Sequence, residues 1–442
     1  MKKQLLIIGN SAAGIGALEA IRRFDSESRI TLLTEERHPI YSRCLLSYLL
    51  AARIGEDQLC YRPADFPQQM NADMQTGKRV ETVLPERQEV QCTDGSRVEY
   101  DRLLIATGGS AKIPDTIPKS AAGIFVLRTL DDAHAILQAL HSTQHAVILG
   151  GGLIGMKAAF ALSQRGLRIT VVVRSAHVLS QMIDAQAAVI IMEKLAAHNI
   201  TVLSGADISS VQLRDNHLAA VNVSTSADHP EYDLPCQMLV VAKGVEPNLE
   251  LIHGTSVQTG RAIVTDSRMR TNIENIFAAG DVAETWDRAT EHYAVNALWT
   301  CAAQQGRIAG HNMIGRISEY DGSIGMNSVN FSGTDLVSFG VVQPPLNSAY
   351  KVLTDYRPRQ GIYKKIVLKD NRIKGLILVN RIHQAGLLLS LLSRKIDVAG
   401  YKEELLEDRF HYAKLIGIGS EEEWGRYSKA PQKNSAYRSI SG

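Results

Sequence analysis

Short apolar strands and Ala-rich helices follow one another in an order that occurs twice along the chain. Gln4–Ala20 and His145–Ala161 each show an apolar strand, a glycine-containing turn and a helix. A second apolar strand follows each helix, at Arg29–Thr34 and Arg168–Val173. A strand, a helix and a second strand in that order give a parallel pair that needs helices on its faces. The repeat therefore predicts an α/β protein with two nucleotide-binding halves.

The pattern around the second copy predicts that it is inserted into the first domain. Asp101–Gly109 before it and Gly260–Asp281 after it both contain an apolar strand that ends at glycine. From Ser318 onward, aromatic-containing strands and two short helices predict a separate α+β module. A polar tail follows, which we expect to be poorly ordered. The predicted limits are 1–112 with 241–317 for the first domain, 113–240 for the second, 318–420 for the C-terminal module and 421–442 for the tail.

Composition and charge exclude some classes of partner. With 45% hydrophobic and 21% charged residues, the chain has the composition of an ordinary globular protein. Its formal net charge of +2 provides no basic surplus for nucleic acid or an anionic membrane. The apolar run before Gly9 has only four residues, too few for a signal peptide or a membrane span. We predict no nucleic-acid partner and no membrane partner.

The cysteines argue against metal and disulfide chemistry within the chain. They are odd in number, scattered and free of C-x-x-C spacing, which disfavours a disulfide scaffold, a zinc site and a self-contained iron–sulfur cluster. The five are Cys44, Cys60, Cys92, Cys236 and Cys301. We therefore predict no metal site and a place in the reducing cytoplasm.

The first glycine turn has the residues that hold a dinucleotide pyrophosphate. In a G-x-G-x-x-G turn between strand and helix, the glycines permit the tight turn, the approach of phosphate and the packing of the helix. Gly9 and Gly14 take the first and third positions. Ser11 replaces the second, where it is small enough to admit phosphate and adds a hydroxyl. The helix that begins with Ala12 and Ala13 offers free N–H groups and a positive dipole.

The second glycine turn carries the complete pattern. Gly150, Gly152 and Gly155 lie between a predicted strand and a helix whose first residues are Leu153 and Ile154. A pyrophosphate can approach the backbone at the second glycine, and the helix N-terminus again supplies N–H groups. The sequence thus predicts a second dinucleotide site.

Residues at the end of each second strand bear on the ribose of the bound nucleotide. A carboxylate about 20 residues past the turn accepts ribose hydroxyls. Glu35 and Glu36 lie at this point in the first half, and we favour Glu36, although either can be a solvated loop carboxylate. The second half has Arg174 in the sequence Val173-Arg174-Ser175, with no carboxylate. An arginine there either accepts a 2′-phosphate, which favours NADPH, or is a surface residue.

Five motifs together resemble a known family. They are GNSAAG at Gly9, EERHPIYSRCLLS at 35–47, ATGG at 106–109, GGGLIG at Gly150 and IFAAGD at 276–281. In order and spacing they are similar to the pyridine nucleotide–disulfide oxidoreductase superfamily, most of all to the branch of rubredoxin and ferredoxin reductases, NADH oxidases, coenzyme A-disulfide reductases and the flavin half of nitrite reductase. The resemblance implies two Rossmann-like domains, the NAD(P)-binding one inserted in the FAD-binding one, and a C-terminal α+β interface domain.

The resemblance also implies which residues surround the cofactors. FAD would lie on the first turn and NAD(P)H on the second, with Thr107 and Gly108 at the junction. Gly280 lets the chain approach FAD closely, and the carboxylate of Asp281 accepts from ribityl hydroxyls or lies beside a phosphate. Leu298 and Trp299 begin a helix predicted to point at the flavin, where its dipole stabilises negative charge.

Three further residues are candidates for the chemistry, and two of them have a plainer alternative. Arg43 is similar to the basic residue that touches the flavin in ferredoxin-reductase-like members. Cys44 lies where disulfide reductases and peroxidases of the family carry a redox cysteine, or it merely packs. Lys157 occupies a position where many relatives have glutamate, and either favours a reduced flavin or an anionic acceptor, or is a surface lysine.

The resemblance implies an enzyme that passes hydride from NAD(P)H to FAD and then electrons to an acceptor. Because the chain has no cluster-binding cysteines, a rubredoxin- or ferredoxin-like partner is the favoured acceptor. The alternatives are a Cys44-dependent reductase of small disulfides, persulfides, peroxide or oxygen, and an NAD(P)H-sensing binding module. The choice between NADH and NADPH stays open. The aromatic strands of the last module and the apolar run Gly386–Leu392 predict a homodimer.

Overall fold

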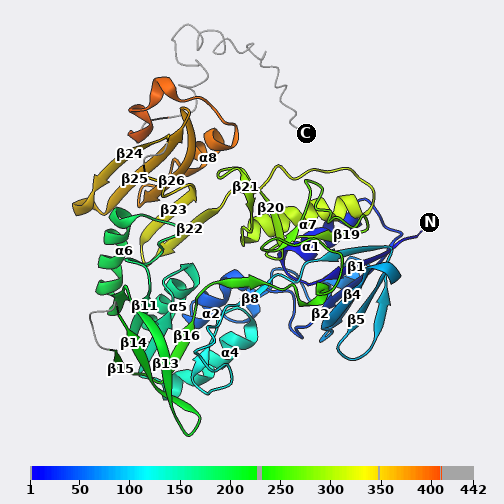
Figure 1. The fold of residues 1–442 in the computed structure, drawn as a ribbon, viewed down its shortest axis with the longest axis horizontal. Coiled ribbons are helices and arrows are strands. Elements are labelled where there is room, and N and C mark those ends of the chain that lie inside the picture. The colour runs from blue at the N-terminus through cyan, green and yellow to red at the C-terminus, as the bar shows by residue number, and fades with distance from the viewer. Residues whose placement is uncertain (1, 226–230, 347–348, 409, 411–442) are drawn as a thin grey trace, which may run out of the picture.

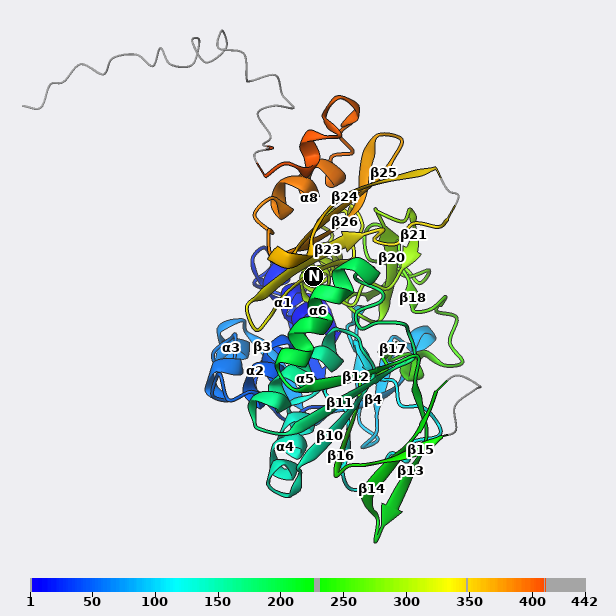
Figure 2. The same cartoon turned by 90° about the vertical axis from the view of Figure 1, so that its left-hand side faces the viewer.

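The computed structural model describes residues 2–225, 231–346, 349–408 and 410. Its elements form three groups, each built around its own sheet, and the C-terminal group lies against the second (Figures 1 and 2). The predicted tail at 421–442 and the last part of the predicted C-terminal module, 411–420, lie outside the described residues.

The first group is built on a parallel sheet in the order β19-β7-β1-β2-β3. These strands are β1 (Gln4–Ile8), β2 (Arg29–Thr34), β3 (Ala72–Thr76), β7 (Arg102–Ile105) and β19 (Ile276–Ala278). The chain therefore leaves this sheet after β7 and returns to it at β19, as the predicted insertion requires. The core between sheet and helices consists of aliphatic side chains such as Ile7, Leu32 and Leu104, all fully buried.

Two helices of the first group pack backbone to backbone on this sheet. They are α1 (Ala12–Arg22) and α7 (Trp299–Met313). A Cβ placed on Gly306 would lie 2.0 Å from the carbonyl oxygen of Ala13, and one on Gly310 would lie 2.6 Å from that of Ala17. The glycines of α7 thus bring its first turn beside the turn that follows β1.

Smaller elements complete the first group. The helices are α2 (Leu46–Leu50) and α3 (Phe66–Gln69). β4 (Val80–Leu84), β5 (Glu89–Cys92) and β6 (Arg97–Glu99) form an antiparallel sheet. A further small sheet consists of β18 (Ile263–Val264), β20 (Ala283–Asp287) and β21 (His292–Ala294), in which β20 pairs in parallel with β18 and antiparallel with β21. β8 (Gly109–Ala111) pairs with β17 (Val245–Pro247), so the two chain crossings between the first and second groups run side by side.

The second group repeats the parallel architecture in the order β12-β11-β10-β16-β9. Its strands are β9 (Ile124–Phe125), β10 (His145–Leu149), β11 (Arg168–Val173), β12 (Ile200–Ser204) and β16 (Met238–Val241), and its helices are α4 (Leu130–Ala139), α5 (Leu153–Gln164) and α6 (Ala185–Ala197). Ile148 faces the helices. Val147 and Leu149 face an antiparallel sheet of β13 (Asp207–Arg214), β14 (His217–Ser224) and β15 (Tyr232–Pro235). Alternate side chains of β10 thus enter two cores, as a buried parallel strand requires.

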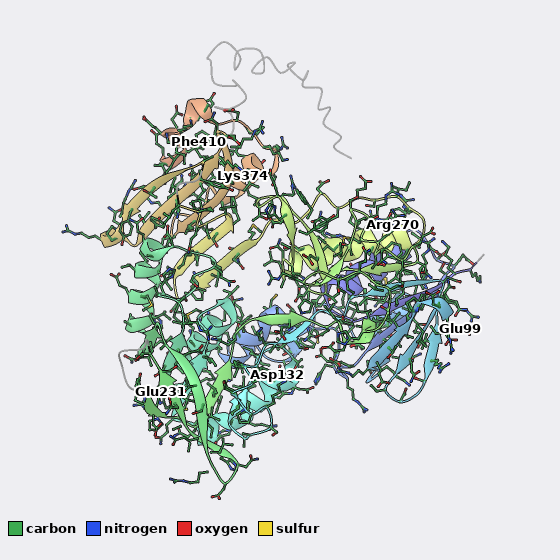
Figure 3. The ribbon with its side chains drawn as sticks, viewed as in Figure 1. Glu99, Asp132, Glu231, Arg270, Lys374 and Phe410 are labelled. Atoms are coloured by element: carbon green, nitrogen blue, oxygen red, sulfur yellow. The ribbon has the colours of Figure 1, made fainter. Side chains whose placement is uncertain are left out.

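The C-terminal group is an antiparallel sheet in the order β22-β23-β26-β25-β24, covered by α8 (Ala385–Ser393). Its strands are β22 (Met326–Phe331), β23 (Thr334–Gly340), β24 (Tyr350–Arg357), β25 (Ile362–Lys369) and β26 (Arg372–Val379). Asp184, which caps α6, accepts hydrogen bonds from the Tyr363 hydroxyl at 2.7 Å and Lys365 Nζ at 2.8 Å. Lys374 reaches Glu291 at 2.8 Å, near the β20–β21 hairpin (Figure 3).

The predicted fold class, with two Rossmann-like units and a C-terminal α+β module, is confirmed by these sheets. The residue limits of the domains stay a prediction. Within the described ranges, none of the helices combines the length and hydrophobicity that crossing a bilayer requires.

Candidate functional site

A cavity of about 560 Å³ lies at the carboxyl ends of β1, β2 and β7 and extends to the first turns of α5. The residues of the first group that were predicted from the sequence and line it are Gly9, Ser11, Ala12, Ala13, Glu35, Glu36, Arg43, Cys44, Thr107, Gly108, Gly280, Asp281, Leu298 and Trp299. From the second group, Leu153, Ile154 and Lys157 line it. One cavity therefore contacts residues of both predicted dinucleotide sites.

The remaining predicted residues lie outside its wall. Gly14 and Gly155 hold their helices against the turns, because a Cβ would lie 1.8 Å from the oxygen of Gly9 in the first case and 2.1 Å from that of Gly150 in the second. Gly150 and Gly152 directly precede α5, at the carboxyl edge of the second sheet. Arg174 follows β11 at the same edge.

The two glycine turns share one backbone geometry. Gly9 has φ +110° and Gly150 has φ +119°, in a region that side chains disfavour. A Cβ would lie 2.2 Å from the Ala106 oxygen at the first turn and 2.3 Å from the Ala242 oxygen at the second. Around Gly152, by contrast, a Cβ would meet no protein atom within 4 Å. Both turns fit a pyrophosphate, which needs helix N–H groups and close access to the backbone.

The buried carboxylate at the end of β2 is Glu36. Its side chain is 10% exposed, whereas that of Glu35 is 55% exposed and pairs with Arg79 at 2.9 Å. Glu36 accepts a hydrogen bond from the Tyr41 hydroxyl at 2.6 Å and forms an ion pair with Arg43. Burial raises the pKa of Tyr41, so that the phenol keeps its proton and donates it. Of the two adjacent acids, Glu36 has the enclosed position that recognition of ribose hydroxyls requires.

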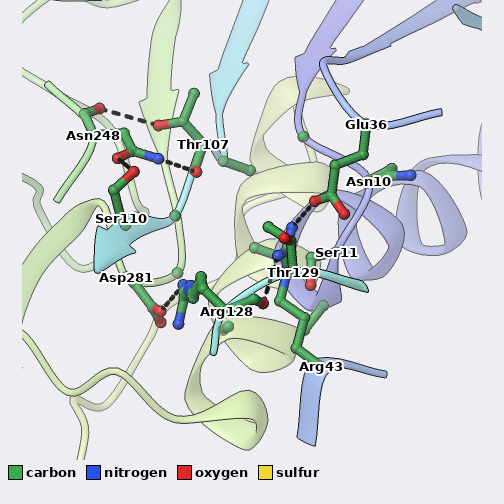
Figure 4. A pocket seen from close by; sticks show the side chains of 18 of the residues that line it. Asn10, Ser11, Glu36, Arg43, Thr107, Ser110, Arg128, Thr129, Asn248 and Asp281 are labelled. Atoms are coloured by element: carbon green, nitrogen blue, oxygen red, sulfur yellow. Dashed lines mark hydrogen bonds and ion pairs between the residues drawn. The ribbon is translucent and has the colours of Figure 1, made fainter. Parts of the chain in front are cut away.

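Arg128 is a site residue that the sequence did not indicate. It lies just before α4 and donates from Nη2 to Asp281 Oδ2 at 2.7 Å, while its backbone oxygen accepts from Arg43 Nη1 at 3.0 Å (Figure 4). A chain of contacts from Glu36 through both arginines to Asp281 therefore crosses the cavity. No motif surrounds Arg128, and only the fold brings it there.

Asn248 is a second residue that sequence reasoning missed. Its Nδ2 donates to the Thr107 oxygen at 2.9 Å, and its Oδ1 accepts from the Ser110 hydroxyl at 2.7 Å (Figure 4). The Thr107 hydroxyl in turn donates to the Asn248 backbone oxygen at 3.2 Å. These bonds fix the Thr107–Gly108 segment against the second chain crossing, which sets the shape of the cavity between the two groups.

The N-terminus of α7 opens onto the cavity. Ala297, Leu298 and Trp299 line it. Leu298, the N-cap, provides no side-chain hydrogen bond, so the first-turn amides and the positive end of the helix are available to a ligand. Deeper in the helix, Gln305 Oε1 accepts from the Gly280 amide at 2.8 Å and fixes the backbone next to Asp281.

Lys157 differs from the other cations that line the cavity. Each of those has a carboxylate partner: Arg43 has Glu36, Arg79 has Glu35, Arg128 has Asp281 and Lys78 has Asp94. Within the described ranges, no ion pair engages Lys157, which is half-buried on α5. Its ammonium thus adds a positive charge without a carboxylate partner among the described residues at the end of the cavity nearest the second group.

Cys44 is exposed and lines the cavity beside Arg43. Next to it, Ser47 and Lys157 line both this cavity and an adjoining depression of about 50 Å³ whose far wall includes Phe331 of β22. The thiol therefore lies at a point that a small molecule can reach. The other exposed cysteine, Cys60, does not line either space.

Comparison with known proteins gives two family-model matches. Residues 3–306 match the pyridine nucleotide-disulphide oxidoreductase model, and residues 326–396 match the rubredoxin NAD+ reductase C-terminal domain. The chain is similar to the epsilon subunit of NADH-dependent phenylglyoxylate dehydrogenase of Aromatoleum evansii, at 31% identity over 94% of this chain and 96% of the relative. It is also similar to the NADH oxidase of Methanocaldococcus jannaschii, at 30% identity over 93% and 95%.

Solved structures agree in fold. A chain of the covalent putidaredoxin reductase–putidaredoxin complex gives a TM-score of 0.84 at 22% identity, covering 94% of this chain and 98% of that chain. The NAD-dependent persulfide reductase from A. fulgidus gives 0.82 at 25% identity, covering 90% and 78%. Since its first 300 residues match the family model and both glycine turns have the expected geometry, the chain belongs to the pyridine nucleotide-disulphide oxidoreductase family and is an FAD- and NAD(P)H-dependent oxidoreductase.

Proposed function

We propose that this oxidoreductase passes electrons from NAD(P)H, through FAD bound at the Gly9 turn, to a small iron–sulfur protein. The observation that carries the proposal is the shared cavity, lined by Gly9 on one side and by Leu153 and Ile154, which follow the other turn, on the opposite side. Hydride transfer needs the reacting atoms about 3–3.5 Å apart, so the two cofactors must end in one space. When bound, FAD supplies the redox chemistry by accepting hydride and releasing electrons one or two at a time.

The residues of the first site hold and orient the cofactor. The turn at Gly9 and the amides of α1 bind the pyrophosphate, as helix N-termini bind anions. Glu36 accepts hydrogen bonds from ribose hydroxyls, and Asp281 from hydroxyls of the ribityl chain. Arg43 and Arg128 pair with these two carboxylates and fix their side chains.

Two positive charges at the cavity would stabilise negative charge on the flavin ring of bound FAD. The first turn of α7 points its positive end there from Leu298, and the ammonium of Lys157 lies on the side of α5. Both stabilise a charge that develops on electron uptake, because they are in place before it appears. This is the role that we assign to Lys157, in place of the plainer alternative of a surface lysine.

An iron–sulfur acceptor is favoured by relatives of this chain. Residues 326–396 match the domain found in rubredoxin NAD+ reductases, and a rubredoxin-NAD(+) reductase of Pseudomonas putida is 28% identical over 63% of this chain and 71% of that protein. No group of three or more potential metal ligands occurs among the residues that the structure describes. Any cluster is therefore expected on the partner.

The decisive experiment is anaerobic mixing of the flavin-loaded protein with NADH or NADPH, followed by addition of oxidised rubredoxin. We expect bleaching of the flavin absorbance near 450 nm as in flavoproteins generally, and its return at a rate that rises with rubredoxin concentration. A flavin that stays oxidised with both coenzymes refutes the proposal. A flavin that is reduced but reoxidised slowly by every acceptor, together with a change in oligomeric state, favours the NAD(P)H-sensing alternative.

A second candidate function rests on the exposure of Cys44 in the cavity wall. In this reaction the Cys44 thiolate would attack one sulfur of a small disulfide, or the inner sulfur of a persulfide, breaking the S–S bond, releasing a thiolate or hydrosulfide and leaving a mixed disulfide on Cys44. Two electrons and a proton, which reduced FAD would supply, would then cleave the mixed disulfide into the Cys44 thiolate and a free thiol. Cys44→Ser should abolish disulfide reduction and leave electron transfer to rubredoxin intact. Cys60→Ser, which changes the other exposed cysteine, is the control. Disulfide reduction that survives in Cys44→Ser removes this candidate.

We also propose a cytoplasmic homodimer. The five cysteines are free thiols, which suits a reducing compartment. The apolar run Gly386–Leu392 does not support the dimer, since Leu388 and Leu391 are buried in the core of their own group. Support comes instead from β24, an edge strand whose Val352 is 42% exposed. Sedimentation at micromolar concentration tests this, and a monomer there refutes it.

A further inference from the structure

The carboxyl edge of the second sheet carries a three-membered charge cluster outside the main cavity. Arg174 follows β11 and Lys243 follows β16, and β10, which ends in the Gly150 turn, lies between these strands. Asp207, the first residue of β13, contacts both. Its Oδ2 accepts from Arg174 Nη2 at 2.5 Å and Nε at 3.0 Å, and its Oδ1 accepts from Lys243 Nζ at 3.1 Å.

The backbone holds Asp207 at this edge. The Ala206 amide donates to the Val173 oxygen at 3.1 Å, and the Gly205 amide donates to the Ser175 oxygen at 3.2 Å. These bonds flank Arg174 on both sides and bring the start of β13 beside it. On the other side, a Cβ at Gly150 would lie 3.3 Å from the Lys243 amide nitrogen. The start of β13 is therefore held beside Arg174 by backbone hydrogen bonds as well as by the ion pairs of Asp207, and Lys243 links Asp207 to the segment next to the Gly150 turn.

Asp207 is ionised and only partly exposed. Its side chain is 21% exposed. Burial alone disfavours the charge, but hydrogen bonds from Arg174 and Lys243 outweigh this effect, so the pKa of Asp207 is lower than usual. Arg174 and Lys243, the two cations that could pair with an additional phosphate, are thus already paired with the Asp207 carboxylate.

We propose that Asp207 makes the second site prefer NADH over NADPH. The inference rests on the proposed function, in which the coenzyme lies on the Gly150 turn. Sites for NADH usually have a carboxylate at the end of the second strand, where it accepts ribose hydroxyls and repels a 2′-phosphate. Here that strand ends in Val173-Arg174-Ser175, and Asp207 supplies the missing carboxylate from a different strand.

Considered without Asp207, Arg174 would predict a preference for NADPH over NADH. Its side chain is 79% exposed and free to turn toward a 2′-phosphate, but doing so separates it from Asp207 and leaves that carboxylate facing the phosphate. Replacing Asp207 with asparagine removes the repulsion and releases both cations. The change in affinity for a 2′-phosphate should then be about tenfold or more, since one charge within a few ångströms in a partly screened site has an effect of that order.

The test is calorimetric titration of the FAD-loaded protein with ADP-ribose and with its 2′-phosphate, which need no electron transfer. The wild type should bind ADP-ribose at least about tenfold more tightly than the 2′-phosphate. Asp207→Asn should bind the 2′-phosphate at least about tenfold more tightly than the wild type does, and Arg174→Gln in that background should cancel the gain. Asp233→Asn is the control, because Asp233 is an exposed carboxylate of the same antiparallel sheet.

Each result decides the question. A wild type that binds the 2′-phosphate equally well, an Asp207→Asn variant with unchanged preference, or a protein that binds neither compound overturns the inference. If Asp207→Asn does not fold, Asp207→Ser takes its place, because it also removes the carboxylate. The same gain in affinity for the 2′-phosphate is expected of it, and an unchanged affinity overturns the inference. Binding as expected without flavin reduction by either coenzyme leaves the role of Asp207 intact and refutes the proposed function.

Discussion

Replacing Gly152 with alanine separates ligand binding from folding at the second turn. Gly152 has extended backbone angles, φ −76° and ψ −179°, that any residue adopts. A Cβ there would meet no protein atom within 4 Å. The folded protein should therefore accept alanine, and the reduced entropy of the unfolded chain should stabilise it by about 0.4–1 kcal/mol. In the placement that we propose, the methyl group would fill the space through which the pyrophosphate approaches the backbone.

The expected signature is a stable protein with a defective coenzyme site. In Gly152→Ala the flavin content should be unchanged, and the KM for the nicotinamide coenzyme should rise about tenfold or more, equivalent to ~1.4 kcal/mol of binding free energy. Urea unfolding and steady-state reduction of a dye measure the two effects. Gly386→Ala on α8 is a matched control, because its Cβ is also unobstructed. An unchanged KM in Gly152→Ala would refute the placement of the pyrophosphate.

Three other changes test the charges. Arg128→Gln leaves the Asp281 carboxylate, which is 15% exposed, without its cation, and should weaken FAD binding about tenfold, as measured by flavin-release titration. The control, Arg79→Gln, removes the cation of an exposed pair and should change FAD affinity less than about threefold. Equal effects of the two substitutions would contradict the assignment of Arg128 to the FAD site. Lys157→Gln should lower the two-electron midpoint potential of the flavin by about 30 mV or more. Lys119→Gln, which changes an exposed lysine outside the cavity wall, is the control. An unchanged potential in Lys157→Gln would show that Lys157 does not act on the flavin. Burial lowers the pKa of Lys364 to about 8 from 10.5, so between these values the unfolded chain binds more protons and stability rises with pH. Lys364→Met should therefore be more stable than wild type below pH 8, and its advantage in urea unfolding should shrink by about 1 kcal/mol or more from about pH 8 to 9.5; a constant difference would show that Lys364 does not titrate there.

The parts of the site that the sequence predicted are those fixed by local geometry. The turn at Gly9 needs a positive φ and no Cβ, and both requirements arise within one strand, one turn and one helix. The same requirement recurs at Gly150, so a repeated pattern of glycine and apolar residues was enough to locate two turns. The helix predicted to begin at Leu298 and Trp299 was found at Trp299–Met313 for the same reason, since its periodicity is local.

Residues that only tertiary structure brings to the site have no recognisable motif around them in the sequence. Arg128 contacts Asp281, which is 153 residues away in the chain, and Asn248 bonds to Thr107 across 141 residues. Asp207 meets Arg174 because β13 begins beside the end of β11. Nothing in the residues around these positions distinguishes them from ordinary surface residues. The choice between adjacent acids was open for a related reason, because burial of Glu36 depends on what packs over it.

The place of the apolar run on α8 also depends on tertiary structure. Counted along the sequence, five leucines between 387 and 392 look like more than a small module needs, which led to the prediction of a subunit contact. In the structure, Leu388, Leu391 and Leu392 are buried against β25 and β26 in their own core. The count alone does not distinguish a core from an interface, because both remove the same apolar area from water.

A carboxylate stands beside a cation at both dinucleotide sites, and this pairing has a consequence for selectivity. Arg43 and Arg128 are held by Glu36 and Asp281, and Arg174 is held by Asp207. A free anion gains little at such a pair, because it must separate the charges before it can bind. A dinucleotide offers hydroxyls to the carboxylates as well as phosphates to the N–H groups of the turn, so it can bind without breaking the pairs. The first site should therefore bind FAD far better than it binds isolated phosphate, and the second should reject a ligand whose extra phosphate replaces a hydroxyl. Lys157, which has no ion pair among the described residues, is the exception, and we propose that it lies where negative charge is created by electron uptake rather than where a bound charge is recognised.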